Sequence, residues 1–329
     1  MSSQPVSSRP ESTYKLYSPD PILTSPPSIY SKENSPIYEP QTSLFNSNFI
    51  QKPLYQHSCR SLNSNSQAPL VNTFNTKPSS TRNSNQPTSL ARSQKSPESL
   101  YKEHLFQTFQ AMKFIQTLGQ PDSEELARKT LWLPKRPGYE HKKTIIFDLD
   151  ETLVHCIQTP ELGDFSINIQ VSETKSVRAG VNIRPFAREV LKSANKDFEV
   201  IVFTASHKCY ADEVMNYLDP TNELIHHRLY RENCLSKSGV FIKDLRIFAN
   251  RKIEDIVIVD NSAYCFAYQL ENGVPIISWF DDYNDRELHK LIEYIKILAH
   301  VPDLCAVNRR TFHLSSFHND YIRDFLKAQ

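Results

Sequence analysis

The feature that most constrains the fold of this chain is a short apolar run, residues 145–147, that leads directly into Asp148-Leu149-Asp150. Such a run, bounded by polar residues, predicts a strand buried on both faces, as in a parallel sheet. In open sheets of this type, ligands bind where the chain leaves the carboxyl end of a strand. Side chains at positions i and i+2 of an extended chain point to the same side. The two aspartates are therefore expected to address one point in space.

The spacing of the two carboxylates also restricts the chemistry. Two like charges held this close repel, and they usually need a cation or a shared proton to coexist. Ligands that offer only oxygen atoms suit Mg²⁺, which favours substrates that carry phosphate. The pattern therefore indicates phosphoryl transfer, in which one carboxylate attacks phosphorus and the other handles the proton of the leaving group.

Strand and helix patterns alternate after this first strand. Apolar runs predict further buried strands at residues 198–204, 225–230, 256–260 and 274–279. Helices are expected between them, and Ser206 suits the N-cap position of one helix. This alternation predicts an α/β fold with a doubly wound parallel sheet.

An insertion is expected directly after the first strand. Pro160 and Gly163 interrupt the chain there, and apolar and polar residues then alternate over residues 165–171. Residues 177–183 form a second, weaker strand pattern. These patterns predict a small insertion of two or three antiparallel strands.

The first 98 residues differ in composition from the rest of the chain. They hold 13 of the 21 prolines, are rich in serine and asparagine, and contain none of the six glycines. Such a segment cannot bury enough apolar surface to offset its conformational entropy, so it is predicted to be disordered. Residues 99–139 are predicted to be a helical lead-in and linker, residues 140–305 the main domain, and residues 306–329 a tail with a small docked helix.

Composition and charge exclude several classes of function. A formal net charge of +1 argues against binding to nucleic acid or a membrane surface through bulk charge. No apolar run approaches the length of a membrane span, and no signal-peptide core is present. The six cysteines form no C-x-x-C pair, so free thiols are expected. We therefore expect a soluble intracellular protein, either nuclear or cytoplasmic.

Polar side chains follow three of the predicted strands. Besides Asp148 and Asp150, Thr204 ends the second buried strand, and Asp260 and Asn261 follow the strand at 256–260. Because the carboxyl ends of parallel strands meet at one edge of a sheet, these side chains are expected to converge. Lys243, on the loop before the fourth strand, is expected to join them.

These residues resemble the four motifs of a known superfamily. Asp148-Leu149-Asp150-Glu151-Thr152, Phe203-Thr204-Ala205-Ser206, Lys243-Asp244-Leu245 and Asp260-Asn261-Ser262 look like the motifs of haloacid-dehalogenase-type phosphatases. More closely, they resemble the branch that includes the small phosphatases of the RNA polymerase II C-terminal domain. Arg184-Pro185 and Ser278-Trp279-Phe280-Asp281 also match that branch. The resemblance covers residues 140–305.

The resemblance implies a role for each matching residue. Asp148 would be the nucleophile, and Asp150 the general acid and then the general base. Thr204 would hold a phosphoryl oxygen, and Lys243 would contact the phosphate as a point charge. The implied cofactor is Mg²⁺, held by the Asp148 carboxylate, Asp150 through its backbone carbonyl, and Asn261. Asp260 would lie beside the metal.

The resemblance also implies substrate contacts at Thr152, Arg231, Ile169 and Val171. The sequence departs from the branch at two positions. Where members that bind phospho-Ser-Pro repeats place an aromatic and an aliphatic residue, this chain has Gln158 and His207. The expected reaction is unaffected. Phosphoserine of the kind found in the RNA polymerase II C-terminal domain is one candidate substrate, and the two polar residues argue against it in favour of another phosphoprotein.

The main prediction is a Mg²⁺-dependent serine/threonine phosphatase that acts on a phosphoprotein through an aspartyl-phosphate. One alternative keeps the chemistry but gives it a small-molecule or lipid phosphate as substrate. The small insertion argues against a small molecule, because no large cap would close over it. Another alternative is a non-catalytic binding module of the same fold.

Overall fold

The structure, a computed structural model, describes residues 96–172, 174–317 and 319. The predicted disorder of residues 1–98 therefore falls almost entirely outside the described residues. Of the predicted C-terminal tail, residues 318 and 320–329 also lie outside the described residues. The boundaries predicted for the domains remain predictions.

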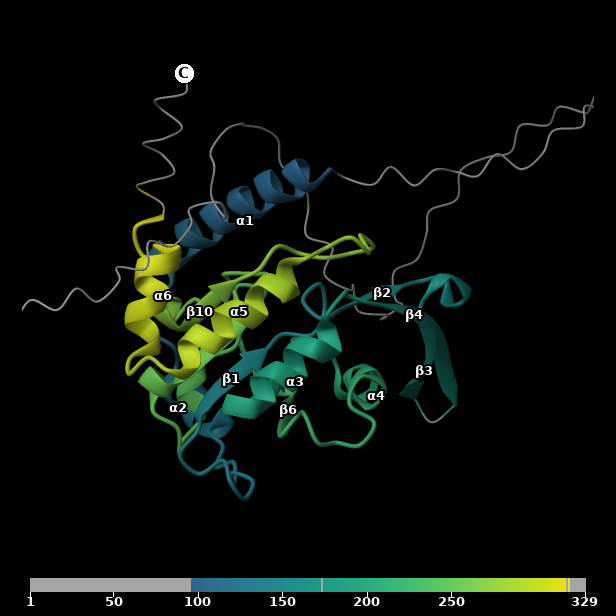
Figure 1. Cartoon of the computed structure of the whole chain (residues 1–329), viewed down its shortest axis with the longest axis horizontal. Helices are drawn as coiled ribbons and strands as arrows, with labels where there is room; N and C mark the ends of the chain where they lie inside the picture. Colours follow the sequence, from purple (N-terminus) through teal and green to yellow (C-terminus); the bar gives the residue numbers. More distant parts are fainter. Residues whose placement is uncertain (1–95, 173, 318, 320–329) are drawn as a thin grey trace, which may run out of the picture. The chain divides into compact units, whose positions relative to one another are not determined.

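A five-stranded parallel sheet in the order β10-β9-β1-β5-β6 forms the centre of the domain (Figure 1). Its strands are β1 (Lys143–Phe147), β5 (Phe198–Phe203), β6 (His227–Leu229), β9 (Ile256–Asp260) and β10 (Gly273–Pro275). The first strand in the sequence, β1, lies in the middle of the sheet. The next two, β5 and β6, lie on one side of it, and β9 and β10 lie on the other. This order confirms the doubly wound fold and sets the switch of direction between β1 and β9.

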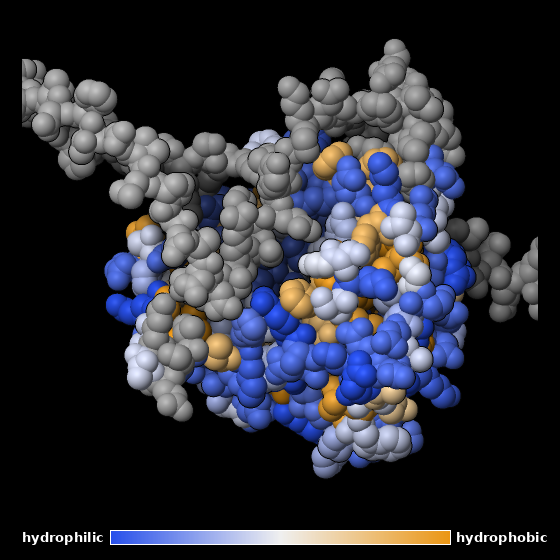
Figure 2. Space-filling model, turned by 180° about the vertical axis from the view of Figure 1, so that it is seen from behind, coloured by the Kyte–Doolittle hydropathy of each residue, from blue (hydrophilic) through white to orange (hydrophobic). Residues whose placement is uncertain are grey.

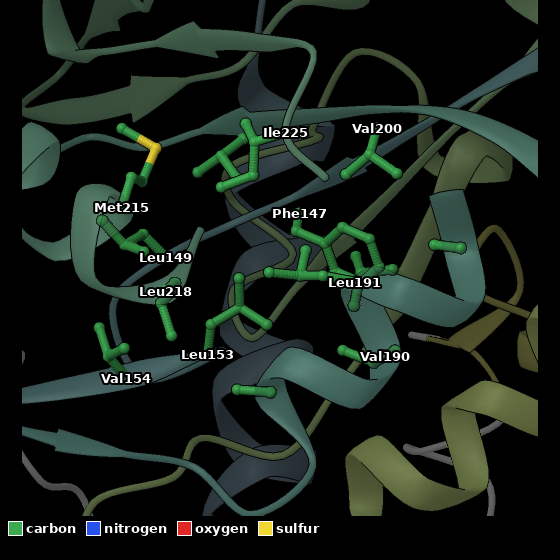
Figure 3. Close-up of a cluster of buried hydrophobic side chains, with 14 of the residues drawn as sticks. Phe147, Leu149, Leu153, Val154, Val190, Leu191, Val200, Met215, Leu218 and Ile225 are labelled. Carbon is green, nitrogen blue, oxygen red and sulfur yellow. The ribbon is translucent and has the colours of Figure 1, made fainter. Parts of the chain in front are cut away.

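Alternate residues of the strands face opposite sides of the sheet, and both sides are buried. Ile145 and Phe147 join one core cluster, whereas Ile146 joins the other. Helices α3 (Ala187–Asp197), α4 (Lys208–Leu218) and α5 (Glu287–Ala299) contribute to the first cluster. Figure 3 shows Val190 and Leu191 of α3 with Met215 and Leu218 of α4. The buried runs predicted from the sequence are apolar because neither face meets water.

The second face of the sheet is covered in part by chain that precedes β1. Helix α1 (Pro97–Thr117) contributes the buried residues Ala111 and Met112 to the second core cluster. The Phe114 ring lies 5.4 Å from the Tyr264 ring, centroid to centroid. Helices α2 (Ser123–Lys129) and α6 (Leu304–Phe312) complete the set of α-helices in the described residues.

The predicted insertion is a three-stranded antiparallel sheet in the order β2-β4-β3. Its strands are β2 (Val154–Ile157), β3 (Phe165–Ser172) and β4 (Lys175–Ile183). A hairpin that the sequence did not indicate joins β7 (Leu235–Lys237) to β8 (Val240–Ile242). Short 3₁₀ helices span Pro160–Leu162, Arg231–Asn233, Leu245–Ile247, Ile253–Asp255 and Leu270–Asn272.

Two local predictions are wrong. The strand expected at residues 274–279 ends at Pro275, and the Trp279 backbone N–H donates to the Glu151 carbonyl instead of extending the sheet. Ser206 is not an N-cap: the N-cap of α4 is His207, which makes no side-chain capping bond. The Ser206 hydroxyl donates instead to Asp150, so a tertiary partner replaces the local one.

The face opposite to that of Figure 1 carries separate hydrophobic patches among hydrophilic residues (Figure 2). Trp132 is the most exposed of the large apolar side chains in the described residues. Within the same residues, no helix has the length and apolar character that crossing a membrane requires.

A buried ion pair lies within the apolar run of β5. Glu199 is fully buried, and its two carboxylate oxygens accept hydrogen bonds from Arg251 at 2.6 and 2.7 Å. The Thr144 hydroxyl, on the paired strand β1, donates to the same carboxylate at 2.7 Å. Burial raises the pKa of Glu199, but hydrogen bonds from His227, Arg251 and Thr144 outweigh it and lower the pKa to about 2.

The first prediction concerns the pH dependence of stability. Glu199→Gln should lower the free energy of unfolding at pH 7 by roughly 3–5 kcal/mol, because it leaves the buried Arg251 charge without the carboxylate that balances it. The folded-state pKa of Glu199 lies below its unfolded value. The stabilisation is therefore complete above about pH 4.5 and is lost as the pH falls toward 2. Urea denaturation of both proteins from pH 7 to pH 3 should show their difference shrinking.

An exposed ion pair supplies the control. Glu293, which pairs with Lys296 on the surface of α5, has a side chain that is 63% exposed. Glu293→Gln should change the unfolding free energy by less than about 1 kcal/mol. An effect of Glu199→Gln as small as that of the control, or one that does not vary with pH, contradicts the assignment.

Candidate active site

The centre of the candidate site is a lysine between two carboxylates. Asp148 follows β1 and Asp260 ends β9, so the two lie on either side of the switch point. The Lys243 ammonium is fully buried and donates to Asp148 Oδ1 at 2.5 Å and to Asp260 Oδ2 at 2.6 Å. Burial alone would lower the pKa of Lys243, but the two carboxylates raise it well above its ordinary value. The lysine is therefore charged and offsets the charges of its partners.

Backbone hydrogen bonds hold each member of this group. The Asp148 N–H donates to the Val259 carbonyl at 2.9 Å and so extends the pairing of β1 with β9. The Ser262 N–H donates to Asp260 Oδ1 at 2.8 Å. The Lys243 N–H donates to the Cys265 carbonyl at 2.6 Å. Each of the three charged residues is thus held by a hydrogen bond that involves the backbone.

A second group of oxygens adjoins Asp148. The Thr152 hydroxyl lies 3.0 Å from Asp148 Oδ2 and 3.4 Å from Asn261 Oδ1. The Asn261 Nδ2 donates to the Ser278 hydroxyl at 2.9 Å, and Asn261 Oδ1 faces the same Thr152 hydroxyl that contacts Asp148. Carboxylate and amide oxygens converge here, and these are the donors that Mg²⁺ prefers. The residues present therefore fit a magnesium ion.

Asp150 has a different environment from Asp148. Its carboxylate accepts from the Ser206 hydroxyl at 2.6 Å, the Tyr210 hydroxyl at 2.6 Å and the Thr204 hydroxyl at 3.4 Å. Burial raises the pKa of Asp150, and the hydrogen bonds from Ser206 and Tyr210 act against that rise. A carboxyl group with a raised pKa is suited to donate a proton.

Ser206 and Tyr210 are site residues that the sequence interpretation missed as partners of Asp150. Ser206 was interpreted as a helix cap, which is an equally common use of serine before a helix. Tyr210 lies on α4 and is buried, as an ordinary core tyrosine would be. Only the path of the chain after β5 brings both hydroxyls to the same carboxylate.

Arg184 connects the first motif to the start of α5. Its guanidinium is fully buried and makes two hydrogen bonds to Asp285, at 2.9 and 3.0 Å. It also donates to the Thr152 carbonyl at 3.2 Å. Asp285 in turn accepts from the Glu287 N–H at the first turn of α5. The bidentate pair therefore fixes the segment that carries the Thr152 hydroxyl.

Glu151 lies between the two aspartates and the insertion. It has a φ of 56°, and its side chain lies 3.2 Å from His155 Nδ1. Burial raises the pKa of Glu151 to about 7, against the opposing effect of His155. The His155 ring packs edge-on against Phe280. His155 thus pairs with Glu151 and packs against Phe280, and within the described residues no hydrogen bond joins it to Asp148 or Asp150.

The remaining predicted substrate contacts lie around this centre. Arg231 donates to the Ala205 carbonyl and lies 3.0 Å from His207 Nε2, on the loop that carries Thr204. Ile169 is half-buried on β3 and packs against the first core cluster. Val171 is on the same strand, and its side chain is outside the described residues. The structure brings Arg231 to the rim, and its contact with phosphate stays a prediction.

Comparison with known proteins places the segment that contains this site in a family. Residues 143–305 match the model of the family described as NLI interacting factor-like phosphatase. This segment is an NLI interacting factor-like phosphatase domain. It contains Asp148, Asp150, Lys243 and Asn261 and ends within α6. The resemblance found in the sequence is thereby confirmed.

Two curated relatives illustrate the similarity of this phosphatase domain to known proteins. CTD small phosphatase-like protein 3 of Caenorhabditis elegans is 40% identical over 178 residues, which is 54% of this chain and 62% of the relative. CTD small phosphatase-like protein of Homo sapiens is 37% identical over 170 residues, or 51% of this chain and 60% of the relative. The chain thus spans less than two thirds of these relatives.

One solved structure also resembles the phosphatase domain. Fcp1, described as an essential RNA polymerase II CTD phosphatase, has a TM-score of 0.39 and 19% sequence identity. The match covers 52% of this chain and 54% of that one.

The second prediction tests the role of Lys243 in stability. Lys243→Met should lower the free energy of unfolding by roughly 3–5 kcal/mol, because Asp148 and Asp260 then lie buried together without a cation. Adding Asp260→Asn to Lys243→Met should restore part of this loss. The measurement is a double-mutant cycle by denaturant titration, and strictly additive effects would show that the pair is not coupled.

Proposed function

We propose that this chain is a Mg²⁺-dependent protein serine/threonine phosphatase that acts through an aspartyl-phosphate on Asp148. The observation that carries the proposal is the contrast between the two aspartates. Asp148 contacts a buried ammonium ion, whereas Asp150 contacts hydroxyl groups and has a raised pKa. Two carboxylates with different environments suit one nucleophile and one proton donor.

In the first step, an Asp148 carboxylate oxygen attacks the phosphorus of a phosphoserine or phosphothreonine. A bond forms between that oxygen and phosphorus, and the bond from phosphorus to the serine or threonine oxygen breaks. Asp150, protonated at the start, gives its proton to the departing oxygen, because an alkoxide is a poor leaving group. Lys243 offsets negative charge beside Asp148 as the phosphoryl group arrives.

In the second step, water attacks the phosphorus of the aspartyl-phosphate. The Asp150 carboxylate accepts a proton from that water, and the bond between phosphorus and the Asp148 oxygen breaks. Inorganic phosphate leaves, and both aspartates return to their starting protonation states. The Ser206 and Tyr210 hydroxyls hold the Asp150 carboxylate in one orientation through both steps.

The Asp148 carboxylate, the Asp150 backbone carbonyl and the Asn261 amide oxygen would hold Mg²⁺. When bound, the ion supplies positive charge that binds and polarises phosphoryl oxygens. Ser278 orients the Asn261 amide toward this position through the hydrogen bond to Nδ2.

A protein substrate is favoured over a small molecule. The insertion after the first motif contains only β2, β3 and β4, and a sheet of three strands is a small cover for an active site. An open site admits a phosphorylated side chain that projects from a larger chain. The names of the two relatives, both CTD small phosphatase-like proteins, point to the same substrate class. Polymerase-tail repeats remain one candidate substrate within this proposal.

The third prediction separates the roles of the two aspartates. Asp148→Asn should abolish hydrolysis of a phosphoserine peptide. Asp150→Asn should lower kcat on that peptide by about 10²- to 10⁴-fold, the usual contribution of a general acid. With p-nitrophenyl phosphate, whose leaving group needs no proton, the Asp150→Asn protein should form the phosphoenzyme and accumulate it.

Mass spectrometry after acid quenching measures this intermediate as the added mass of one phosphoryl group on the peptide that contains residue 148. The Asp148→Asn protein, treated in the same way, is the control and should carry none. Wild-type protein that hydrolyses neither substrate in the presence of Mg²⁺ would favour the non-catalytic binding module.

The fourth prediction concerns the metal. Ser278→Ala should raise the Mg²⁺ concentration needed for half-maximal activity by about tenfold, because Asn261 loses the partner that orients its amide. Ser316→Ala is the matched control: it also removes a serine hydroxyl that makes a hydrogen bond, in this case to the His313 carbonyl. It should leave the Mg²⁺ requirement unchanged. Titration of activity with Mg²⁺ after removal of metal by EDTA checks both variants, and equal requirements would contradict the role given to Ser278.

A further inference from the structure

A polar groove of about 550 Å³ lies between α4 and β6. One side is formed by Lys208, Asp212 and Asn216 of α4, and the other by Arg228 of β6 and Tyr230 just beyond it. We call this region the α4–β6 groove. Neither the family match nor the motifs of the catalytic centre assign it a role.

The acidic residues of the groove are already occupied by donors. Asp219 is almost fully buried and accepts from the backbone N–H groups of residues 223, 224 and 225 at 2.8–3.1 Å. Asp212 accepts from the Tyr230 hydroxyl and from Lys208, each at 2.6 Å. These carboxylates therefore have little capacity for further donors from a ligand.

The basic residues of the groove retain donor capacity. Arg228 lies 2.7 Å from Asn216 Oδ1 and 3.3 Å from Asn222 Oδ1, which are neutral acceptors, and 3.4 Å from Asp212. The Lys208 side chain is 61% exposed although its ammonium donates to Asp212 and to the Tyr230 hydroxyl. Guanidinium and ammonium groups carry five and three donors, so a ligand rich in acceptors fits them.

The groove leads directly to the rim of the catalytic centre. His207 precedes Lys208 and Arg231 follows Tyr230, so each wall continues into one member of the His207–Arg231 contact. The Arg231 N–H donates to the Ser206 carbonyl at 3.0 Å. The Ser206 hydroxyl in turn contacts Asp150. A chain lying in the groove would therefore end beside the proposed proton donor.

We propose that the α4–β6 groove binds the part of the phosphoprotein substrate next to the phosphorylated residue and selects segments that carry acidic side chains there. The proposal rests on the proposed function and adds a substrate class to it. The bound segment is an extended peptide whose carboxylates, or a second phosphate, contact Lys208 and Arg228. His207, polar and exposed, admits such a segment at the rim.

The test uses three phosphoserine peptides of equal length. One carries four glutamates before the phosphoserine, one carries them after it, and one has glutamine at all eight positions. The wild-type protein should hydrolyse one glutamate peptide with a kcat/KM about fivefold or more above that of the glutamine peptide, mainly through KM. Two partly exposed ion pairs supply a preference of this size.

The variant Lys208→Gln/Arg228→Gln should lose most of this preference. The hydrogen-bond partners of both residues lie outside the cluster around Asp148, so turnover of p-nitrophenyl phosphate should stay within about twofold. The variant Lys290→Gln/Lys296→Gln removes two exposed lysines from α5, each paired with a glutamate, and is the matched control. It should keep the full preference. Lys208→Gln alone, at an exposed position, gives the same readout if the double variant is unstable.

Equal kcat/KM values for the three peptides with the wild-type protein, or an unchanged preference in the groove variants, would overturn the proposal. Its failure is distinguishable from failure of the proposed function. If the wild-type protein hydrolyses no phosphate ester, fluorescence anisotropy with the same peptides still measures binding to the groove. Tighter binding of one glutamate peptide, lost in the groove variant and kept in the control, supports the groove alone.

Discussion

Two buried carboxylates can lie at neighbouring strand ends because the Lys243 ammonium lies between them. Each buried carboxylate costs several kcal/mol of desolvation without a partner, and two together also repel. One lysine that contacts both offsets these costs, so β1 and β9 can end at the same point of the sheet. The Thr152 hydroxyl and the Asn261 amide are then positioned around a centre whose charges are already compensated. The doubly wound topology brings these two strand ends together, and the lysine offsets the cost of burying two carboxylates there.

Asp150, two positions along the chain from Asp148, is the same residue type but has different contacts. Its contacts are hydroxyl groups from the segment after β5 and from α4, so its charge is solvated by dipoles and not by a cation in direct contact. Because the two carboxylates have different environments, their affinities for a proton differ. A mechanism with one nucleophile and one acid requires such a difference. The segment directly after the first strand thus supplies both groups, while other elements of the fold determine how their environments differ.

Much of this arrangement could be predicted from the sequence because the signals are local. The apolar runs of β1, β5 and β9 and the polar residues at their ends are sufficient to predict the sheet and the convergence of the site. Contacts chosen by the tertiary fold could not be predicted. Ser206 has the same sequence context whether it caps a helix or contacts Asp150, and Glu199 finds Arg251 across 52 residues of chain. The strands β7 and β8 have three residues each, too few to show a period.

Helix α1 precedes the segment that matches the family, yet Ala111 and Met112 are part of the core that covers one face of the sheet. Tyr268, inside the matched segment, also donates to the Gly119 carbonyl just after that helix. The segment that matches the family model and the unit that folds therefore have different lengths in this chain. A protein that began at residue 143 would keep every member of the catalytic cluster but would expose apolar surface to water, and its solubility and its chemistry would be decided by different stretches of sequence.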